Sequence, residues 1–167
     1  MHKMTEENLK SAFAGESQAH MRYLIFAKKA EEEGKLNIAR LFKAISFAEQ
    51  VHATNHYHVL GMVKDTPANL EEAISGENYE VEEMYPAFDA VAKLQDEKDA
   101  QRSIGYALEA EKIHEKMYAD AKKAAEAGKD IEIGDVYICP VCGYTAEGSA
   151  PDRCPVCGTP KEKFAKF

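Results

Sequence analysis

Residues 49–52 read Glu-Gln-Val-His, and residues 111–114 repeat this spacing as Glu-Lys-Ile-His. Each pair lies in a run whose apolar residues recur every three or four positions, as on the inward face of a helix. Residues three apart share one helix face, so each carboxylate and its imidazole point the same way. Either pair alone arises easily by chance, but two such helices are typical of a dinuclear metal site inside a helix bundle.

Further carboxylates occupy inward positions of two other expected helices. Glu16 lies in the apolar run of a helix expected over 5–34, and Glu80 and Glu83 lie three apart in a helix expected over 77–94. Burying unpaired carboxylates is costly unless cations neutralise them. The sequence therefore predicts a dinuclear site with these ligands: Glu16, Glu49, His52, Glu80, Glu83, Glu111 and His114. Such a carboxylate-rich set favours iron or manganese over structural zinc.

The helical pattern predicts an all-α bundle of four helices. Those expected at 5–34 and 37–61 are joined by a tight turn and should be antiparallel neighbours. The stretch 62–76 is expected to be a crossover with a short helix of its own, which lets helices two and three run parallel. The fourth helix is expected from Asp96 to Gly128. A four-helix bundle with one long crossover is the ferritin-like arrangement.

Four cysteines follow the bundle in two nearly identical knuckles, Cys139-Pro-Val-Cys142 and Cys154-Pro-Val-Cys157, separated by eleven residues. We call these four residues the cysteine box. The spacing predicts a tetrahedral four-thiolate site, which suits zinc as well as iron. The segment around it is too short to form a core without a metal. A redox-inert zinc would be an odd partner for a dinuclear iron site, so the bundle favours iron in the box.

The composition is that of a globular protein, with 45% hydrophobic and 30% charged residues. A formal net charge of −8 argues against nucleic-acid binding, which requires a basic face. No apolar run approaches the roughly 20 residues of a membrane span, and the first residues lack the apolar core of a signal peptide. We therefore expect a cytoplasmic protein that binds neither nucleic acid nor membrane and whose cysteines bind metal.

With both sites in this order, the chain resembles the rubrerythrin family over nearly its full length. The resemblance is carried by Glu16, Glu49-Gln-Val-His52, Glu80-Val-Glu-Glu83-Met-Tyr-Pro, Glu111-Lys-Ile-His114 and the two cysteine knuckles. It implies a ferritin-like domain at 1–134 with two iron ions, followed by a small rubredoxin-like β domain at 135–167 with one. It also implies that a diferrous site reduces hydrogen peroxide to water. The electrons would come from NAD(P)H through a rubredoxin reductase, often with a free rubredoxin.

The resemblance further implies roles for individual ligands. Glu49 and Glu111 would bridge the two irons. Glu16 would be a terminal ligand of one iron, and Glu80 and His114 would be terminal ligands of the other. One iron moves on reduction in the family and exchanges a carboxylate for a histidine, which here would be Glu83 and His52. Phe88 stands five residues after Glu83, where family members often carry a tyrosine.

Tyr23 is the third candidate catalytic residue, beside Glu83 and His52. It lies two helical turns after Glu16 on the same face and could hydrogen-bond a ligand carboxylate. A tyrosine that only packs in the core is an equal alternative.

Two other functions stay open from the sequence. A ferroxidase or iron-handling protein would oxidise iron as its substrate. The cysteine box argues against this alternative, because iron storage needs no dedicated centre that supplies electrons. A metal-binding sensor would carry a structural zinc ribbon in place of an iron centre. Metal analysis would separate these three functions.

We expect a homodimer or higher homo-oligomer. The fourth helix continues for fourteen residues after His114, which carries the chain about 21 Å from the bundle site. We therefore expect one chain's cysteine box to serve the bundle site of another chain. The crossover also makes exchange of helix pairs between protomers conceivable.

Overall fold

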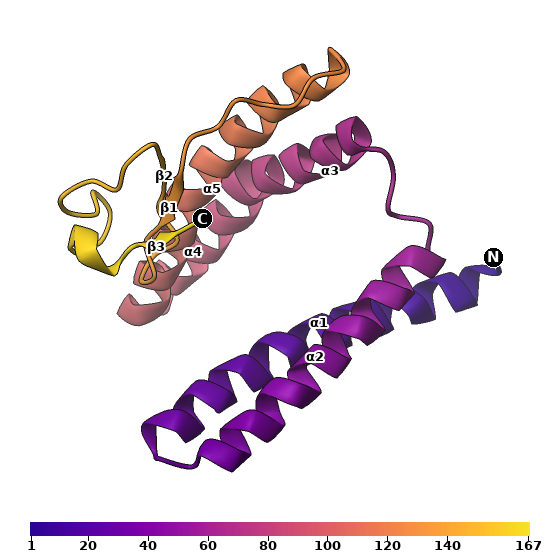
Figure 1. Ribbon diagram of the computed structural model, residues 1–167, viewed down its shortest axis with the longest axis horizontal. Coiled ribbons are helices and arrows are strands. Elements are labelled where there is room, and N and C mark those ends of the chain that lie inside the picture. The colour runs from indigo at the N-terminus through magenta and orange to yellow at the C-terminus, as the bar shows by residue number, and fades with distance from the viewer. The chain divides into compact units, whose positions relative to one another are not determined.

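The computed structural model describes residues 1–167 and divides into two compact units, Met1–Lys64 and Asp65–Phe167. We call them the N-terminal and the C-terminal unit. The N-terminal unit consists of helices α1 (Lys3–Glu32) and α2 (Leu36–Val59) (Figure 1). The C-terminal unit contains, in chain order, α3 (Thr66–Tyr79), η1 (Glu80–Met84), α4 (Tyr85–Leu94), α5 (Lys98–Glu126), β1 (Val136–Ile138), β2 (Thr145–Glu147), η2 (Lys161–Lys163) and β3 (Ala165–Lys166). No helix combines the length and the apolar character that crossing a membrane would demand.

The N-terminal unit is a hairpin of two antiparallel helices. Gly34 adopts a positive φ of 72° in the turn between them, a conformation that costs glycine little. The residues buried between the helices are all small: Ala19, Ala27, Ala30, Ala39, Ser46 and Ala53. Small side chains allow close approach of the two backbones, but they bury little apolar surface. The larger residues Ile38 and Ile45 on the inward run of α2 remain exposed.

In the C-terminal unit, α3, η1 and α4 follow one another without a break and pack against α5. The Asp65 side chain caps α3 by accepting a hydrogen bond from the Ala68 N–H at 3.1 Å. The segment η1 is a π-helical turn, a feature often found at functional sites. Pro86 follows it and has no N–H to offer the carbonyl of Glu82. The wider turn therefore accommodates the proline without ending the helix.

The helix that we expected over 77–94 begins at Thr66 instead. Thr66-Pro67 does start a helix, as the sequence indicates, but Gly76 does not end it. A single glycine costs an exposed helix only about 1 kcal/mol, which the contacts between α3 and α5 offset. As a result only residues 60–65 join α2 to α3, a shorter connection than the expected crossover at 62–76.

The C-terminal strands form a three-stranded antiparallel sheet in the order β2-β1-β3. The two cysteine knuckles flank it with the same hydrogen-bond pattern. The Gly143 N–H donates to the carbonyl of Cys139 at 3.0 Å, and the Gly158 N–H donates to that of Cys154 at 2.9 Å. Both glycines have positive φ, near 77°, which explains why glycine follows each knuckle.

Candidate metal centres

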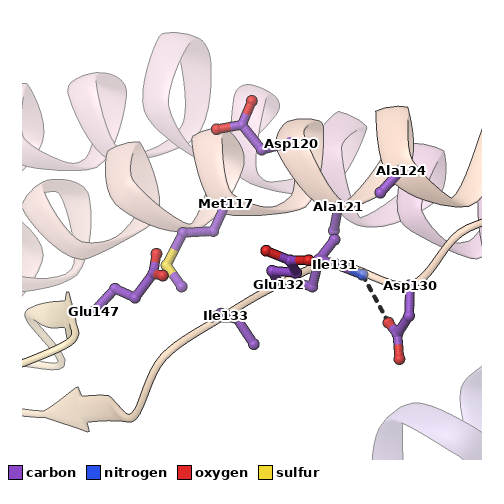
Figure 2. Close-up of a pocket in the computed structure, with 9 residues that line it drawn as sticks. All are labelled: Met117, Asp120, Ala121, Ala124, Asp130, Ile131, Glu132, Ile133 and Glu147. Atoms are coloured by element: carbon purple, nitrogen blue, oxygen red, sulfur yellow. Dashed lines mark hydrogen bonds between the residues drawn. The ribbon is translucent and has the colours of Figure 1, made fainter.

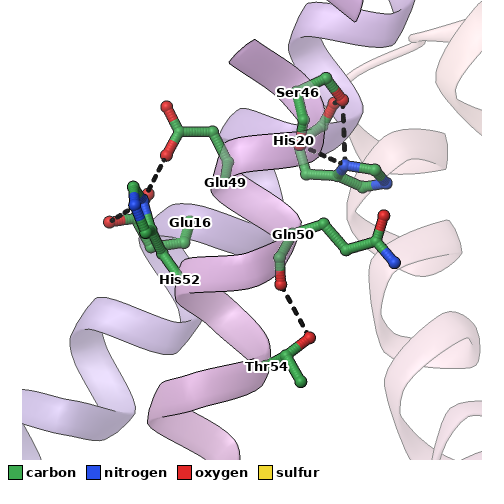
Figure 3. A network of polar contacts seen from close by, with 7 residues as sticks. All are labelled: Glu16, His20, Ser46, Glu49, Gln50, His52 and Thr54. Carbon is green, nitrogen blue, oxygen red and sulfur yellow. Dashed lines mark hydrogen bonds and ion pairs between the residues drawn. The ribbon is translucent and has the colours of Figure 1, made fainter. Parts of the chain in front are cut away.

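The N-terminal unit brings together Glu16 of α1 with Glu49 and His52 of α2. His52 Nδ1 lies 3.0 Å from Glu49 Oε2 and 3.9 Å from Glu16 Oε1 (Figure 3). One ligand atom from each residue falls within 4.8 Å of the others, a spacing that one metal ion could bridge. We call these three residues the first half-set. Its two carboxylates are half-buried, whereas the His52 side chain is 54% exposed.

A buried hydrogen-bond network holds α1 and α2 in register beside the first half-set. Ser46 is fully buried, and its hydroxyl donates to the backbone carbonyl of His20 at 2.9 Å. His20 Nδ1 in turn lies 2.9 Å from the carbonyl of Ser46 (Figure 3). His20 therefore serves as a hydrogen-bonding residue between the helices. This reciprocal pair fixes the rotation of α1 against α2 and thereby the approach of Glu16 to His52.

Tyr23 packs against aromatic rings in the same unit. Its ring centroid lies 6.3 Å from that of Phe26 and 6.1 Å from that of Phe42. These contacts support the alternative in which Tyr23 is a core residue. A hydrogen bond from its hydroxyl to a ligand stays a prediction.

The C-terminal unit holds the second Glu-x-x-His pair on α5. His114 Nδ1 lies 2.7 Å from Glu111 Oε2, and Glu77 of α3 completes a trio whose ligand atoms lie within 4.8 Å of one another. We call Glu77, Glu111 and His114 the second half-set. Glu80 begins η1 beside it and is half-buried, whereas Glu83 on the same turn is exposed.

Glu77 was not among the ligands that we predicted from the sequence. We expected it at the start of a helix, where an acidic residue needs no further explanation. Because α3 begins at Thr66, Glu77 instead lies well inside the helix and beside α5. The signal that could have found it is the regular spacing of three that joins Glu77, Glu80 and Glu83.

The carboxylates of the C-terminal unit repel one another in the absence of a cation. Burial, a hydrogen bond with Glu111 and the Glu111 charge raise the pKa of Glu77 to about 7. Burial and Glu111 likewise raise the pKa of Glu80, against the opposing effect of His114. Divalent cations would invert this local balance and favour the ionised carboxylates. The donor set therefore fits hard metal ions such as iron or manganese.

The cysteine box is also shaped for a metal ion. The Sγ atoms of Cys139 and Cys157 lie 3.5 Å apart, and those of Cys142 and Cys154 lie 3.4 Å apart. These separations approach the edge of about 3.8 Å in a tetrahedron with metal–sulfur bonds of about 2.3 Å. All four cysteines are free, and three of them are buried. Although burial opposes it, hydrogen bonds with Thr159 lower the pKa of Cys157 to about 6, which favours the thiolate that binds metal.

The segment after α5 doubles back along that helix. Residues 130–133 lie beside Met117, Ala121 and Ala124 of α5, where they line a cavity of about 300 Å³ (Figure 2). Gly143 lies against the side chain of Ala110, so that a Cβ at position 143 would stand 3.5 Å from the Cβ of Ala110. Tyr106, also on α5, packs against the cysteine cluster. Our expectation that α5 carries the box away from its own chain's ligands was therefore wrong. Seven extended residues span about 24 Å, enough to retrace the fourteen helical residues beyond His114.

A hydrogen-bonded link joins the cysteine box to the second half-set. His114 Nε2 lies 2.7 Å from Oγ1 of the buried Thr145, and the Thr145 hydroxyl donates to the carbonyl of Gly143 at 3.1 Å. Gly143 directly follows Cys142. Because the Thr145 hydroxyl donates its hydrogen to the Gly143 carbonyl, it can only accept from His114. The Nε2–H of His114 is therefore the donor to Thr145 Oγ1. Thr145 was not predicted from the sequence, since nothing in a short strand marks it as a neighbour of α5.

This tautomer leaves a lone pair on His114 Nδ1, facing Glu111 Oε2 at 2.7 Å. Two acceptors at that distance need a proton or a cation between them. A metal-ligating histidine usually donates its other N–H to a neighbouring group, as His114 does to Thr145. His114 could therefore bind a metal ion through Nδ1.

Comparison with known proteins agrees with this geometry. The family model described as rubrerythrin matches residues 7–122, and the model of the rubrerythrin rubredoxin-like domain matches residues 137–165. The chain belongs to the rubrerythrin family. It is 48% identical to rubrerythrin-2 of Clostridium acetobutylicum, over 98% of this chain and 97% of the relative. It is 34% identical to a rubrerythrin of Nitratidesulfovibrio vulgaris, over 96% of this chain and 92% of the relative.

Solved structures of nigerythrin are similar to this chain as well. The fully reduced, all-ferrous form aligns with a TM-score of 0.58 at 34% identity, covering 98% of this chain and 86% of that one. The mixed-valent form aligns with a TM-score of 0.57 at 35% identity and the same coverage. The existence of both forms shows that the irons of nigerythrin change oxidation state.

Family membership confirms several of the sequence predictions. The four long helices and the small C-terminal sheet confirm the predicted fold class, a ferritin-like bundle followed by a rubredoxin-like domain. A rubrerythrin domain has a di-iron site with carboxylate and histidine ligands, and the four-cysteine site of the rubredoxin-like domain fits one iron. The chain is thus a di-iron protein of a family of oxidoreductases that generally have peroxidase activity. The boundary between 134 and 135 and the ligand assignments stay predictions.

Proposed function

We propose that this rubrerythrin reduces hydrogen peroxide to water and receives its electrons through its own cysteine box. The observation that carries the proposal is the link from Cys142 through Gly143 and Thr145 to His114. A protein that only stores iron, or that holds a structural zinc, does not need such a connection between its two metal sites. It gives electrons a short route from the cysteine box to a proposed ligand of the bundle site.

The reaction balances with two electrons and two protons for each peroxide. The O–O bond breaks, each oxygen takes up protons, and two water molecules leave. Two ferrous ions held by these carboxylates and histidines would supply both electrons together, so that no hydroxyl radical need be released. The external reductant is NAD(P)H, acting through a rubredoxin reductase, a rubredoxin or both. Val141 in the first knuckle is exposed beside Cys142, and we propose that such a donor docks against it.

We propose that the seven predicted residues hold the irons in the roles that the family resemblance implies. Glu49 and Glu111 are among the least exposed side chains, at 16% and 17%, which suits fixed bridging ligands. His52 and Glu83 are the exposed members, which suits a pair that exchanges on the same iron. Glu77 stands close enough to Glu111 and His114 to join the site in one oxidation state.

The test of this function uses protein that is purified without oxygen and contains iron in both sites. Peroxide-dependent oxidation of NADH or NADPH is measured with a purified rubredoxin reductase and rubredoxin. We expect one nicotinamide oxidised per peroxide consumed, with activity that requires both centres. The Glu111→Ala and Cys157→Ser variants serve as separate controls for the two centres. Unchanged turnover in either variant would contradict the proposal.

A further inference from the structure

We infer that Thr159 sets the reduction potential of the cysteine box through a hydrogen bond from its hydroxyl to the sulfur of Cys157. Thr159 binds no metal itself and acts through Cys157, so it is a positioning residue. The inference rests on the proposed function in one respect, since the electrons that enter the box are taken to continue to the bundle site.

The two cysteine knuckles have the same backbone geometry and can be compared position by position. The Cys139 N–H donates to the carbonyl of Tyr144 at 2.9 Å, and the Cys154 N–H donates to that of Thr159 at 2.8 Å. Tyr144 and Thr159 therefore occupy corresponding places, each two residues after the second cysteine of its knuckle. At this place the knuckles differ in the side chain and not in the backbone.

The side chain of Thr159 reaches a sulfur of the box. Its Oγ1 lies 3.0 Å from Sγ of Cys157. Among side chains, the sulfurs of the other three cysteines lie within hydrogen-bond distance of cysteines alone. The box is therefore asymmetric, because one of its four sulfurs has a hydroxyl neighbour.

Metal binding determines the direction of this hydrogen bond. A cysteine binds a metal ion as the thiolate, so the sulfur of Cys157 then has no proton to donate. The hydroxyl of Thr159 is therefore the donor. Thr159 is only 8% exposed, and the structure gives its hydroxyl no second partner. Cys157 is the one cysteine that is not fully buried, so the hydroxyl stands at the sulfur that solvent can approach.

A donor to this sulfur favours the reduced box. With four thiolates, a ferric ion leaves one net negative charge on the centre and a ferrous ion leaves two. The positive end of the hydroxyl dipole of Thr159 stabilises the more negative state more strongly, and the reduction potential rises. One electron enters and no proton is taken up, because all four sulfurs stay bound to the iron. The box thus accepts electrons more readily than it would without this hydroxyl.

Replacement of Thr159 by valine removes the hydroxyl and keeps the shape. We expect the equilibrium between the two oxidation states to shift about tenfold toward the oxidised box, which corresponds to a potential lower by about 59 mV for one electron. Spectroelectrochemical titration of the box absorption, in the full-length protein loaded with iron, measures this potential. The Thr159→Ser variant keeps a hydroxyl and should restore the potential of the parent protein.

The first knuckle offers a matched control. Tyr144→Phe removes a hydroxyl from the corresponding residue, where it contacts no sulfur, so the potential should stay that of the parent. Iron analysis must show a filled box in every variant that is compared. If Thr159→Val does not keep its box iron, Thr159→Ala takes its place. A purely structural role of Thr159 would lower the iron content of the box and leave the potential of the filled box unchanged.

The rates of the two electron-transfer steps provide a second readout. In Thr159→Val, reduction of the box by the reductase should become slower, because the driving force of that step falls. Transfer from the box to the oxidised bundle site should become faster, because its driving force rises by the same amount. A structural defect would slow both steps.

Three results would overturn the inference. They are an unchanged potential in iron-loaded Thr159→Val, a Thr159→Ser variant that behaves like the valine variant, and loss of box iron from both the valine and the alanine variant. If the potential falls as expected but the parent protein does not reduce peroxide, the role of Thr159 stands and the proposed function fails.

Discussion

His114 Nε2 and Thr145 Oγ1 lie 2.7 Å apart, although 31 residues separate them in the sequence. One belongs to the helix that carries the second Glu-x-x-His pair, and the other opens the strand that follows the first cysteine knuckle. This contact ties the orientation of a predicted iron ligand to the position of the cysteine box. We therefore propose that Thr145 couples the two centres.

Replacing Thr145 by valine removes the hydroxyl and keeps the shape. We expect re-reduction of the di-iron site by the box to slow by about 10- to 100-fold, the range seen when partners of metal ligands are lost. The Thr145→Ser variant keeps the hydroxyl and should stay near the rate of the parent protein. Stopped-flow absorption of the box, after the bundle site has been oxidised, measures the rate. Equal rates for valine and serine variants would show that the hydrogen bond is unimportant.

Removal of metal should make stability depend on pH through Glu77. Its pKa rises from 4.5 to about 7 on folding, so the folded state holds this proton more tightly than the unfolded state does. Between these two values, rising pH therefore destabilises the metal-free protein. We expect the melting temperature after chelation to fall from pH 5 to pH 8.

The Glu77→Gln variant provides the matched control for this effect, since it keeps the size of the side chain but cannot ionise. The melting temperature of its metal-free form should change less over the same pH range. Restoring iron should have a similar effect, because the cations favour ionised carboxylates. A melting temperature of the metal-free parent that rises over this range would contradict the assignment.

The cysteine box should be dispensable for a single turnover. In Cys157→Ser the bundle keeps all of its ligands, so chemically reduced protein should consume peroxide at nearly the rate of the parent. Steady-state turnover with reductase should be lost, because electrons cannot re-enter the site. Loss of the single turnover, in protein that still contains bundle iron, would contradict this separation of roles.

The parts of the site that follow from local geometry could be predicted from the sequence. The spacing of three aligns Glu49 with His52 and Glu111 with His114 on any helix, and the paired Cys-x-x-Cys knuckles specify a tetrahedral site. Thr145 could not be found in this way, because its role depends on a contact with α5 that forms only in the tertiary structure. The same spacing of three includes Glu77, but only the packing of α3 beside α5 brings Glu77 to Glu111 and His114.

The path of the chain between its helices and strands could not be predicted from the sequence either. Gly76 is a typical helix end in sequence, yet packing of α3 against α5 carries the helix through it. The path of residues 130–133 along α5 likewise depends on side-chain contacts and not on local propensity. These two segments decide which ligands and which box lie near each other.

We propose that the reduced bundle site is built for peroxide. Protein reduced without oxygen is mixed in a stopped-flow instrument with hydrogen peroxide in one experiment and with dioxygen in another, at equal concentrations. We predict that peroxide oxidises the di-iron site much faster than dioxygen does, because an extra carboxylate, Glu80, and the exchangeable residues Glu83 and His52 suit a symmetric site that binds both peroxide oxygens. Oxidation by dioxygen at an equal or higher rate would contradict the account and indicate a ferroxidase or oxidase.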